Sequence, residues 1–592
     1  MKRILLSILA SGMCAAVMAI PAKPGFIAYT QPDGTVVNIQ ISGDEHAHMI
    51  YSEDGLLLLE ADGRMEYAKF DNDGFPIPSG IAVGPLKERS FISQQLQPKH
   101  LVENWANKLN DEKTLKFERL QSLMQPKLLN TRSEEDSVED DDRVVPMNFG
   151  RCKSTFPVLG VQKGLVILVE YEDVSFEEYL QKPSEKGIFD YFNRMLNEKG
   201  FSDYGSLGSA RDWFVENSNG LFLPDFDVYG PVKLPNKREY YGGNDSRGND
   251  LHPEDMAVHA CQMLDDTVDF SQYDRDGDGI IDNVFIFYAG KGEHDSGVKN
   301  AVWPHSWDVI AVYEEPFIFD GVTLRQYACT CEYPSGYKRP DGIGTFVHEF
   351  SHVMGLPDLY NTANQYGTYC TGNWSVMDNG TYNNDRLTPP NYSSYEKCAL
   401  GWIDLKPITE GKVEIHDLSS SNEAYVLPTE NENEFFFFEN RQQLGNDKFL
   451  PGHGMLVWHI DYKVGPWTAN TVNNVMTHQR VDIVEADRIA SSATAGGDPF
   501  PGLNEVTSFG YETSPQLLSW TRKRQAFDLQ DISESDDGVI SFNAVAYNPN
   551  EENAVEGIEA DMQSDFYYDL MGRRVNNPTK GIFIHKGKKV IF

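Results

Sequence analysis

The sequence predicts a multidomain chain with a β-rich leader, a mixed α/β (α+β) main body and a C-terminal β-sandwich. The chain has 592 residues, of which 40% are hydrophobic and 12% aromatic, so it can bury several cores. Short apolar runs between turn signals dominate the first hundred residues, and helical periodicity appears in the middle of the chain. That periodicity disappears again after about Val413. These patterns divide the chain into three parts.

The N-terminal segment and the net charge indicate where the protein acts and which partners it does not bind. Residues 1–19 read MKRILLSILASGMCAAVMA, and their basic start, apolar run and small residues before position 20 predict a secretory signal peptide. The apolar run is too short for a comfortable membrane span, and no later run is longer. The net charge of −38 repels phosphate backbones and anionic lipid, so we expect no nucleic-acid partner.

Residues 20–143 form the predicted leader. The turn signals QPDGT, SEDG, ADG and DNDG separate short apolar runs up to about residue 100, which indicates β-hairpins. We expect a helix over roughly residues 94–129. The acidic run NTRSEEDSVEDDDR, residues 130–143, has almost nothing to bury, and like-charge repulsion keeps such a run extended and accessible to proteases. We interpret it as a linker, with a solvated surface loop as the alternative.

The main body is predicted over residues 144–405. GLVILVEY, residues 164–171, and VFIFYAG, residues 284–290, are near-continuous apolar runs typical of buried strands. Helices are expected over residues 176–197 and 208–218.

The predicted β-sandwich covers residues 406–548. EFFFFEN, GMLVWHIDY, QRVDIVEA and GVISFNAVAY are short apolar segments between Gly, Pro and Asn turns. Residues 549–592 begin as a polar linker and end in two short strands around Gly587, which predict a small hairpin.

Six cysteines remain after residue 19. An even number permits disulfides in an exported chain, but the spacing fixes no pairing. The chain contains no CxxC pair, so we expect no thiolate zinc knuckle. In a strand, Cys329 and Cys331 would point to opposite faces and would have different partners or none.

The strongest chemical signal is GTFVHEFSHVMGLPDLYN, residues 344–361. On an α-helix His348 and His352 lie on one face, so their two imidazoles can bind one metal ion. Glu349 projects beside them, where it can take a proton from a water molecule that the ion activates.

The residues after this helix supply the expected third ligand. Gly355 can adopt the left-handed conformation that ends a helix sharply, and the proline at 357 prevents the helix from resuming. The turned chain then brings Asp358 back toward the ion. Three protein ligands and one open position predict a catalytic zinc site. Two alternatives are a helix whose histidines only contact the core, and a zinc site with a downstream glutamate, but no glutamate lies between Val353 and Tyr395.

Several motifs together resemble a known family. Met377 in WSVMDNG, residues 374–380, has the setting of the methionine turn below the zinc of metzincin proteases. With HEFSHVMGLPDLYN, GSARDWFVENSNGLFLPDFDVYGPV (208–232) and YDRDGDGIIDNVFIFYAG (273–290), it resembles the immune inhibitor A type (thuringilysin, M6) metzincins. The resemblance runs from about residue 163 to 402 and continues through FFFFENRQ, LPGHGMLVWHIDY and GGDPFPG.

The resemblance implies a metzincin-like catalytic domain in a secreted zinc endopeptidase that is made as a zymogen. The leader would then be a propeptide, and Asp358 rather than a histidine would be the third ligand. One departure concerns the tyrosine that some metzincins place two residues after the turn methionine. That position is Asn379 here, and Tyr382 is only a weak substitute.

A second candidate metal site lies in DRDGDGIID, residues 274–282. The carboxylates of Asp274, Asp276, Asp278 and Asp282 and the Ile280 carbonyl match positions 1, 3, 5, 9 and 7 of a calcium loop. Position 12 is a phenylalanine instead of glutamate, so the loop is not an EF-hand. A merely acidic, glycine-rich turn is the alternative. His305, His453 and His459 are expected to be structural or near the substrate rather than metal ligands.

We therefore expect a secreted or cell-surface zinc metalloendopeptidase that hydrolyses peptide bonds in extracellular proteins, with Zn²⁺ and Ca²⁺ as cofactors. The alternative is an adhesin or glycan-binding protein on a catalytically unused scaffold, but such a protein would not need Glu349. The basic C-terminal segment resembles the sorting signal of type IX secretion, which implies a secretion machinery in the outer membrane as a partner; an ordinary terminal hairpin is the alternative.

Latency is expected to end with a cut between about residues 131 and 163. In the uncut form, the Cys152 thiolate or a leader carboxylate such as Asp54 could block the zinc.

Overall fold

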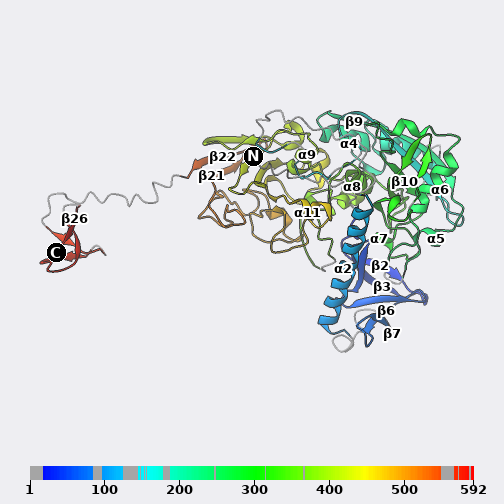
Figure 1. Ribbon diagram of the computed structural model, residues 1–592, viewed down its shortest axis with the longest axis horizontal. Coiled ribbons are helices and arrows are strands. Elements are labelled where there is room, and N and C mark those ends of the chain that lie inside the picture. Colours follow the sequence, from blue (N-terminus) through cyan, green and yellow to red (C-terminus); the bar gives the residue numbers. More distant parts are fainter. Residues whose placement is uncertain are drawn as a thin grey trace, which may run out of the picture.

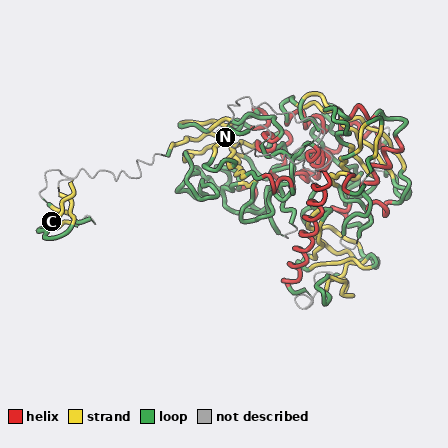
Figure 2. Tube along the Cα trace, viewed as in Figure 1, coloured by secondary structure: helices red, strands yellow, loops and turns green. Residues whose placement is uncertain are grey.

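The fold is known from a computed structural model (Figures 1 and 2). It describes residues 18–84, 97–124, 144–146, 149–152, 154, 156–177, 187–245, 248–313, 315–363, 367–547, 566–570, 573–585 and 588–592. Most of the expected signal peptide, the acidic run and the linker after residue 547 lie outside these residues.

The leader forms an antiparallel sheet whose six strands follow one another in sequence order. The strands are β2 (Ile27–Thr30), β3 (Val36–Asp44), β4 (Ala47–Ser52), β5 (Leu57–Ala61), β6 (Arg64–Phe70) and β7 (Pro76–Ala82). Most of the expected Gly-containing turns connect them, as the sequence predicts. The helix α2 (Lys99–Met124) falls within the expected range of 94–129, of which residues 94–96 and 125–129 lie outside the described residues, and it packs Leu109 against Met49 and Tyr51 of the sheet. In Figure 2 it runs along the leader strands.

A second sheet forms the centre of the main body. Its strand order is β1-β11-β14-β10-β8-β9, and β14, β10, β8 and β9 are parallel to one another. The strands are β1 (Met18–Ala19), β8 (Gly160–Glu170), β9 (Phe222–Lys233), β10 (Val284–Tyr288), β11 (His305–Asp308) and β14 (Gln326–Cys331). The two apolar runs of the sequence are therefore buried strands, as predicted. The edge strand β1 is the end of the expected signal peptide, directly before the leader, and it pairs antiparallel with β11.

Both faces of this sheet are covered. Val166 and Leu168 of β8 belong to one hydrophobic cluster, and Leu165, Ile167 and Val169 belong to the other. The first cluster contains the helices α3 (Ile188–Asn197), α4 (Ala210–Asn217) and α8 (Ile343–Val353), and the second contains α6 (Glu254–Leu264). Of the expected helix over 176–197, the structure describes α3, and residues 178–186 lie outside the described residues. Shorter helices are α5 (Arg238–Gly242), α7 (Glu293–Ser296) and α9 (Ser394–Ala399), and β12 (Phe317–Phe319) pairs with β13 (Val322–Leu324).

Two further sheets follow the main body. One has the order β15-β17-β18-β19-β20 and the other β16-β22-β21. Their bounds are β15 (Lys406–Pro407), β16 (Gly411–Ile415), β17 (Tyr425–Pro428), β18 (Glu434–Arg441), β19 (Gly454–Asp461), β20 (Val481–Ile483), β21 (Phe527–Glu534) and β22 (Ile540–Ala546). The short helices α10 (Leu418–Ser421) and α11 (Val464–Thr468) lie between them in sequence.

The side chains of strand β18 connect these sheets to the main body. Phe436 and Phe438 share a hydrophobic cluster with residues of both C-terminal sheets. The alternate residues Phe435 and Phe437 belong to the cluster that also contains α8. All eight residues of β18 are buried, which explains the continuous rather than alternating apolar run of the sequence.

The remaining strands form a small sheet at the C-terminus. β25 (Ile582–His585) and β26 (Lys588–Ile591) pair antiparallel, which confirms the expected terminal hairpin, and β23 (Tyr567–Tyr568) and β24 (Arg574–Val575) extend it. All six cysteines of the described residues are buried free thiols. The described helices include none that combines the length and the apolar character of a membrane span.

Candidate metal centre and the cleft above it

The motif helix α8 carries the two histidines and the glutamate on buried positions. His348 and Glu349 are fully buried, and His352 is 6% exposed. The helix ends at Val353, and two residues later Gly355 has a φ of +96°, where a Cβ atom would lie 2.4 Å from the Cys152 carbonyl oxygen. Glycine is therefore required here for both conformation and space. The sharp end of the helix turns the chain toward Asp358.

Three ligand atoms converge on one point. The Nε2 atoms of His348 and His352 are 3.1 Å apart, and they lie 3.3 and 3.2 Å from Asp358 Oδ1. Ligands of a tetrahedral zinc ion, each about 2.0–2.1 Å from the metal, are separated by about 3.3 Å. Asp358 Oδ1 is buried and makes no hydrogen bond. This donor set fits zinc.

The outer atoms of these ligands are held by the protein. His348 Nδ1 lies 2.7 Å from the Val376 carbonyl oxygen and His352 Nδ1 lies 2.8 Å from the Leu356 carbonyl oxygen. Because a carbonyl oxygen only accepts, each Nδ1 carries the proton and each Nε2 keeps its lone pair for a metal. Sequence reasoning placed Met377 below the site, and the structure places it fully buried next to Val376, with its own carbonyl accepting from Leu359 N.

The third ligand is fixed by a residue that sequence reasoning missed. Asn470 Nδ2 donates to Asp358 Oδ2 over 2.6 Å, and Asn470 Oδ1 accepts from the Asp358 backbone N–H over 2.9 Å. Burial alone would raise the pKa of Asp358, but the neighbouring imidazoles outweigh it and hold that pKa below its ordinary value. Asn470 lies 112 residues further along the chain, after α11, and no local pattern marks it.

Glu349 is in contact with the leader. Its Oε1 accepts a hydrogen bond from the Ile20 backbone N–H over 2.9 Å, and its Oε2 has no hydrogen-bond partner. Burial raises the pKa of Glu349 well above its ordinary value, and the nearby carboxylates of Glu45 and Asp358 raise it further.

Residues on both sides of Ile20 lie across the metal site. Ala19 pairs with His305 of β11, and the carbonyl oxygen of Ala19 accepts from the Tyr360 hydroxyl over 2.5 Å. The Ile20 carbonyl oxygen accepts from Trp303 Nε1 over 2.9 Å. Ala19 and Ile20 therefore cover the cleft beside Glu349.

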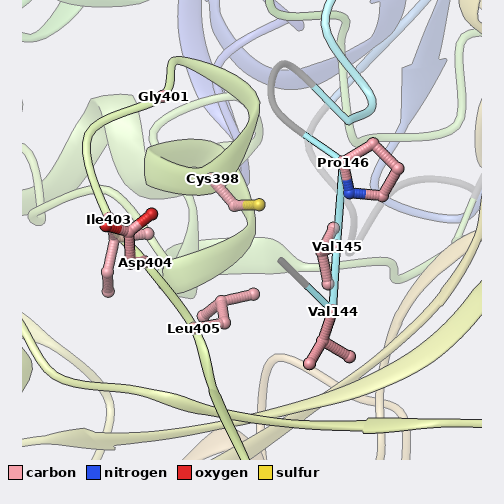
Figure 3. A pocket seen from close by; sticks show the side chains of 8 residues that line it. All are labelled: Val144, Val145, Pro146, Cys398, Gly401, Ile403, Asp404 and Leu405. Atoms are coloured by element: carbon pink, nitrogen blue, oxygen red, sulfur yellow. The ribbon is translucent and has the colours of Figure 1, made fainter. Parts of the chain in front are cut away.

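The two groups expected to block the metal lie elsewhere. The Cys152 thiol is buried 3.5 Å from the Trp467 carbonyl oxygen, and Asp54 is exposed in a turn of the leader sheet. Where the structure describes the chain, the ligand group contains only the two histidines and Asp358, with no thiol and no leader carboxylate. The segment just before Cys152 docks on the end of α9: Figure 3 shows the Cys398 side chain pointing toward Val145 and Pro146.

The acidic loop forms the second cluster. Carboxylate oxygens of Asp274, Asp276 and Asp278 lie within 4.8 Å of one another. Burial raises the pKa of Asp278 to about 6 and that of Asp282 to about 8, and the neighbouring carboxylates contribute. The loop is closed by the N–H groups of Asp278 and Gly279, which donate to Asp274. In the chain, Ile280 lies between Gly279 and Asp282.

The other histidines have protein partners instead of a place at the metal. His305 is buried in β11, with Nδ1 at the Trp303 carbonyl oxygen and Nε2 at the Tyr327 hydroxyl. His453 and His459 contact the carboxylates of Glu534 and Glu434.

Comparison with known proteins finds a family model that matches the region holding this site. Residues 158–402 match the family model described as "Immune inhibitor A peptidase M6, catalytic domain". The chain is 28% identical over 274 residues to Immune inhibitor A of Bacillus thuringiensis subsp. alesti, covering 40% of this chain and 39% of that protein. It is 23% identical over 334 residues to the Pre-pro-metalloprotease PrtV of Vibrio cholerae serotype O1, covering 47% of this chain and 36% of the relative. The matched region thus spans well under half the length of these relatives.

Proposed function

We propose that the chain is the latent precursor of a zinc-dependent endopeptidase, because residues 158–402 match the model of an M6 peptidase catalytic domain. The observation that carries the proposal is the buried triad of His348, His352 and Asp358 with Glu349 beside it. The substrates would be protein chains outside the cell.

Each residue of the site has its own role in the proposed reaction. His348, His352 and Asp358 would hold the zinc ion, which when bound supplies a Lewis acid that activates water and polarises a carbonyl group. Glu349 is the general base: it takes a proton from the attacking water and delivers it to the leaving amine. Asn470 holds Asp358 in place, and the carbonyls of Val376 and Leu356 orient the imidazoles.

Burial raises the pKa of Glu349 in the uncut chain. In the uncut chain the leader adds to the effect, because Glu45 stands among the groups that raise the pKa. Removal of the leader would take this carboxylate away and open the site to water.

We also infer that the leader keeps the enzyme latent. The Ile20 backbone N–H donates a hydrogen bond to Oε1 of Glu349, the general base. The rings of His46 and His48 lie over Trp307 and Trp303, with centroids 5.0 and 4.9 Å apart. These contacts cover the edge of the central sheet where a substrate strand would pair.

The helix α2 holds the leader on the segment that follows the third ligand. Lys113 Nζ, which also contacts Asp44, donates to the Thr362 carbonyl oxygen over 3.2 Å. Asn110 Nδ2 donates to the carbonyl oxygen of Ala363 over 2.5 Å. Cleavage alone therefore does not activate the enzyme, because the freed leader must also leave the cleft.

Two further parts of the proposal concern calcium and export. The loop at 274–282 would bind Ca²⁺, since its raised carboxyl pKa values reflect a charge that a cation would neutralise. Residues 1–19 would direct export, and the basic terminal hairpin would be a type IX sorting signal. The name of the Vibrio cholerae relative, Pre-pro-metalloprotease PrtV, describes that protein as one made with two N-terminal segments.

A protease assay on a denatured protein tests the proposal. Material cut near residue 143 and separated from its leader should hydrolyse the substrate, and a zinc chelator should abolish the hydrolysis. The uncut chain should be inactive, and uncut Cys152→Ala should be as inactive as its parent, because the thiol lies at Trp467. A zinc-loaded, leader-free protein without activity would refute the enzymatic function, and a fully active uncut chain would refute latency alone.

A further inference from the structure

The motif helix α8 ends against a short segment that follows the leader. This segment, which we call the strut, comprises residues 149–152, 154 and 156. A helix leaves its last carbonyl oxygens without partners of its own, and the strut donates to three consecutive ones at the end of α8. The pairs are Ser154 Oγ to Val353, Arg151 Nε to Met354 over 2.7 Å, and the Cys152 backbone N–H to Gly355 over 2.8 Å.

These three carbonyl groups belong to the turn between two metal ligands. His352 precedes the turn and Asp358 follows it, and their ligand atoms are 3.2 Å apart. The turn and the strut are in close contact at Gly355, where a Cβ atom would lie 2.4 Å from the Cys152 carbonyl oxygen and 3.2 Å from Arg151 Cγ. A shift of the strut would therefore move the turn, and with it the distance between the two ligands.

The guanidinium group of Arg151 bridges the strut and the helix. Its Nε donates to the end of α8, and its Nη2 donates to the Phe156 carbonyl oxygen over 3.2 Å. Burial lowers the pKa of Arg151 to about 10, so the group remains positively charged at neutral pH. A positive charge at the C-terminal end of a helix is favourable, because the negative end of the helix dipole lies there.

The strut also contacts the residues that hold the third ligand. The Tyr395 hydroxyl donates to the Gly150 carbonyl oxygen over 3.2 Å and accepts from Trp467 Nε1 over 2.8 Å. The Cys152 thiol and the Asn470 backbone N–H both donate to the Trp467 carbonyl oxygen, over 3.5 and 3.1 Å. Because the Asn470 side chain binds the third ligand, the strut connects the end of the histidine helix with the residue that fixes the aspartate.

Aromatic packing holds both ends of the strut in the core. The ring of Phe149 packs edge-on against Phe435 of β18, with centroids 5.0 Å apart, and Phe156 packs in the same way against Phe350 of α8 at 4.9 Å. Such pairs stabilise beyond the area that they bury. Both partners lie outside the leader, so these contacts remain when the leader has left.

We propose that the strut stays in the activated enzyme, and that Arg151 is a positioning residue for the metal ligands His352 and Asp358. This inference rests on the proposed function, because it concerns the enzyme that the activating cut releases. A cut after Arg151 would remove the guanidinium group from the main body together with the leader. The activating cut therefore lies before Arg151, in the first part of the expected range of 131–163.

The first test measures the zinc affinity of the full chain by competition with a zinc indicator. Arg151→Met removes the charge and both hydrogen bonds at similar side-chain length, and zinc binding should weaken by about tenfold. Arg151→Lys keeps a charged donor at the helix end, so its affinity should lie closer to that of the parent. A zinc affinity of Arg151→Met within about threefold of the parent's would overturn the proposal.

Arg194→Met is the matched control, since Arg194 is ion-paired with Asp190 and Asp203 at α3. It should bind zinc like the parent. An equal loss of affinity in both variants would refute the role of Arg151, because overall stability would then set the affinity. Cobalt(II) in place of zinc gives a second readout: its visible absorption spectrum depends on the ligand geometry, and Arg151→Met should shift it.

A milder variant decides the question if Arg151→Met does not fold. Ser154→Ala removes one donor at the end of α8 and no charge, and it should weaken zinc binding by about threefold. An unchanged zinc affinity in this variant would then speak against the strut.

The second test locates the cut. The full chain is digested briefly with proteases of different specificity, the leader is separated, and the N-terminus of each product is sequenced. Products that retain zinc should begin at or before Arg151. A leader-free product that begins after Arg151 and binds zinc as tightly as the longer products would contradict the proposal. A product that holds zinc but cleaves no protein would remove the proposed function, while the zinc affinities would still decide the role of Arg151.

Discussion

The two candidate metal clusters found among the described residues differ in how their carboxylates are held. Asp358 is buried with two histidines, and its other oxygen is clamped by Asn470 from beyond the main body. Asp274, Asp276 and Asp278 are at least partly exposed, lie within five residues of one another, and are held by the N–H groups of their own loop.

The difference shows what each arrangement needs from a metal. The buried triad has fixed distances of 3.1–3.3 Å and a pKa of Asp358 below its ordinary value, so it can take an ion without rearrangement. In the loop, burial and mutual repulsion raise the pKa values of Asp278 and Asp282. A cation in the loop would neutralise these carboxylates and stabilise the fold.

The largest effect is expected from the base that accompanies the triad. Glu349→Gln should keep zinc and lose proteolysis by about 10²–10⁴-fold, because the amide keeps the shape of the side chain but cannot take a proton. Metal analysis and a protease assay on leader-free protein measure the two halves. Activity close to that of the parent would mean that another residue is the base.

Loss of the third ligand should act on the metal itself. We expect Asp358→Ala to weaken zinc binding by more than the 10–100-fold that follows from loss of a hydrogen-bonding neighbour. Asp404→Ala is the matched control, since Asp404 is an exposed carboxylate on the far side of the Cys398 pocket in Figure 3. Zinc content after dialysis against a mild chelator separates the two variants. Equal retention would place the third ligand elsewhere.

The sequence predicts the site residues that lie close together in the chain and misses those that come from distant segments. The spacing of His348, His352 and Asp358 follows from the helical repeat and a glycine that ends the helix, so it can be read from eleven residues. Asn470 and Ile20 reach the site only through tertiary packing, over sequence separations of 112 and 329 residues. No periodicity encodes such contacts.

The fold shows the same division. The continuous apolar runs of β8 and β10 predict buried strands because both of their faces are covered. The run EFFFFEN predicts a buried strand as well, but not that one face would join the cluster of α8. The expectation that the Cys152 thiolate blocks the metal failed for a similar reason: Cys152 is near the motif in the fold, but its thiol points to Trp467.

A smaller effect is expected from the distant clamp. Asn470→Ala should weaken zinc binding by about 10–100-fold, because Asp358 loses hydrogen bonds at Oδ2 and at its backbone N–H. Asn473→Ala is a useful control, since its amide donates to the Leu359 and Val481 carbonyls instead of to the ligand. A competition titration with a zinc indicator gives both affinities. If the two variants bind zinc equally, the clamp does not tune the triad.

The smallest effect is expected at the acidic loop. Calcium that binds only the folded protein stabilises it by about 2.7 kcal/mol at a free concentration 100 times Kd, which raises Tm by several degrees in a domain of this size. The Asp276→Ala/Asp278→Ala variant removes two of the clustered carboxylates and should lose this shift while it keeps its zinc. Its Tm without calcium should be no lower than that of the parent, because burial and repulsion raise the pKa of both groups. Thermal unfolding of both proteins, with calcium and with a calcium chelator, measures the shifts. An equal calcium shift in the two proteins would place the stabilising ion outside the loop and leave the triad as the only one of the two clusters with a metal.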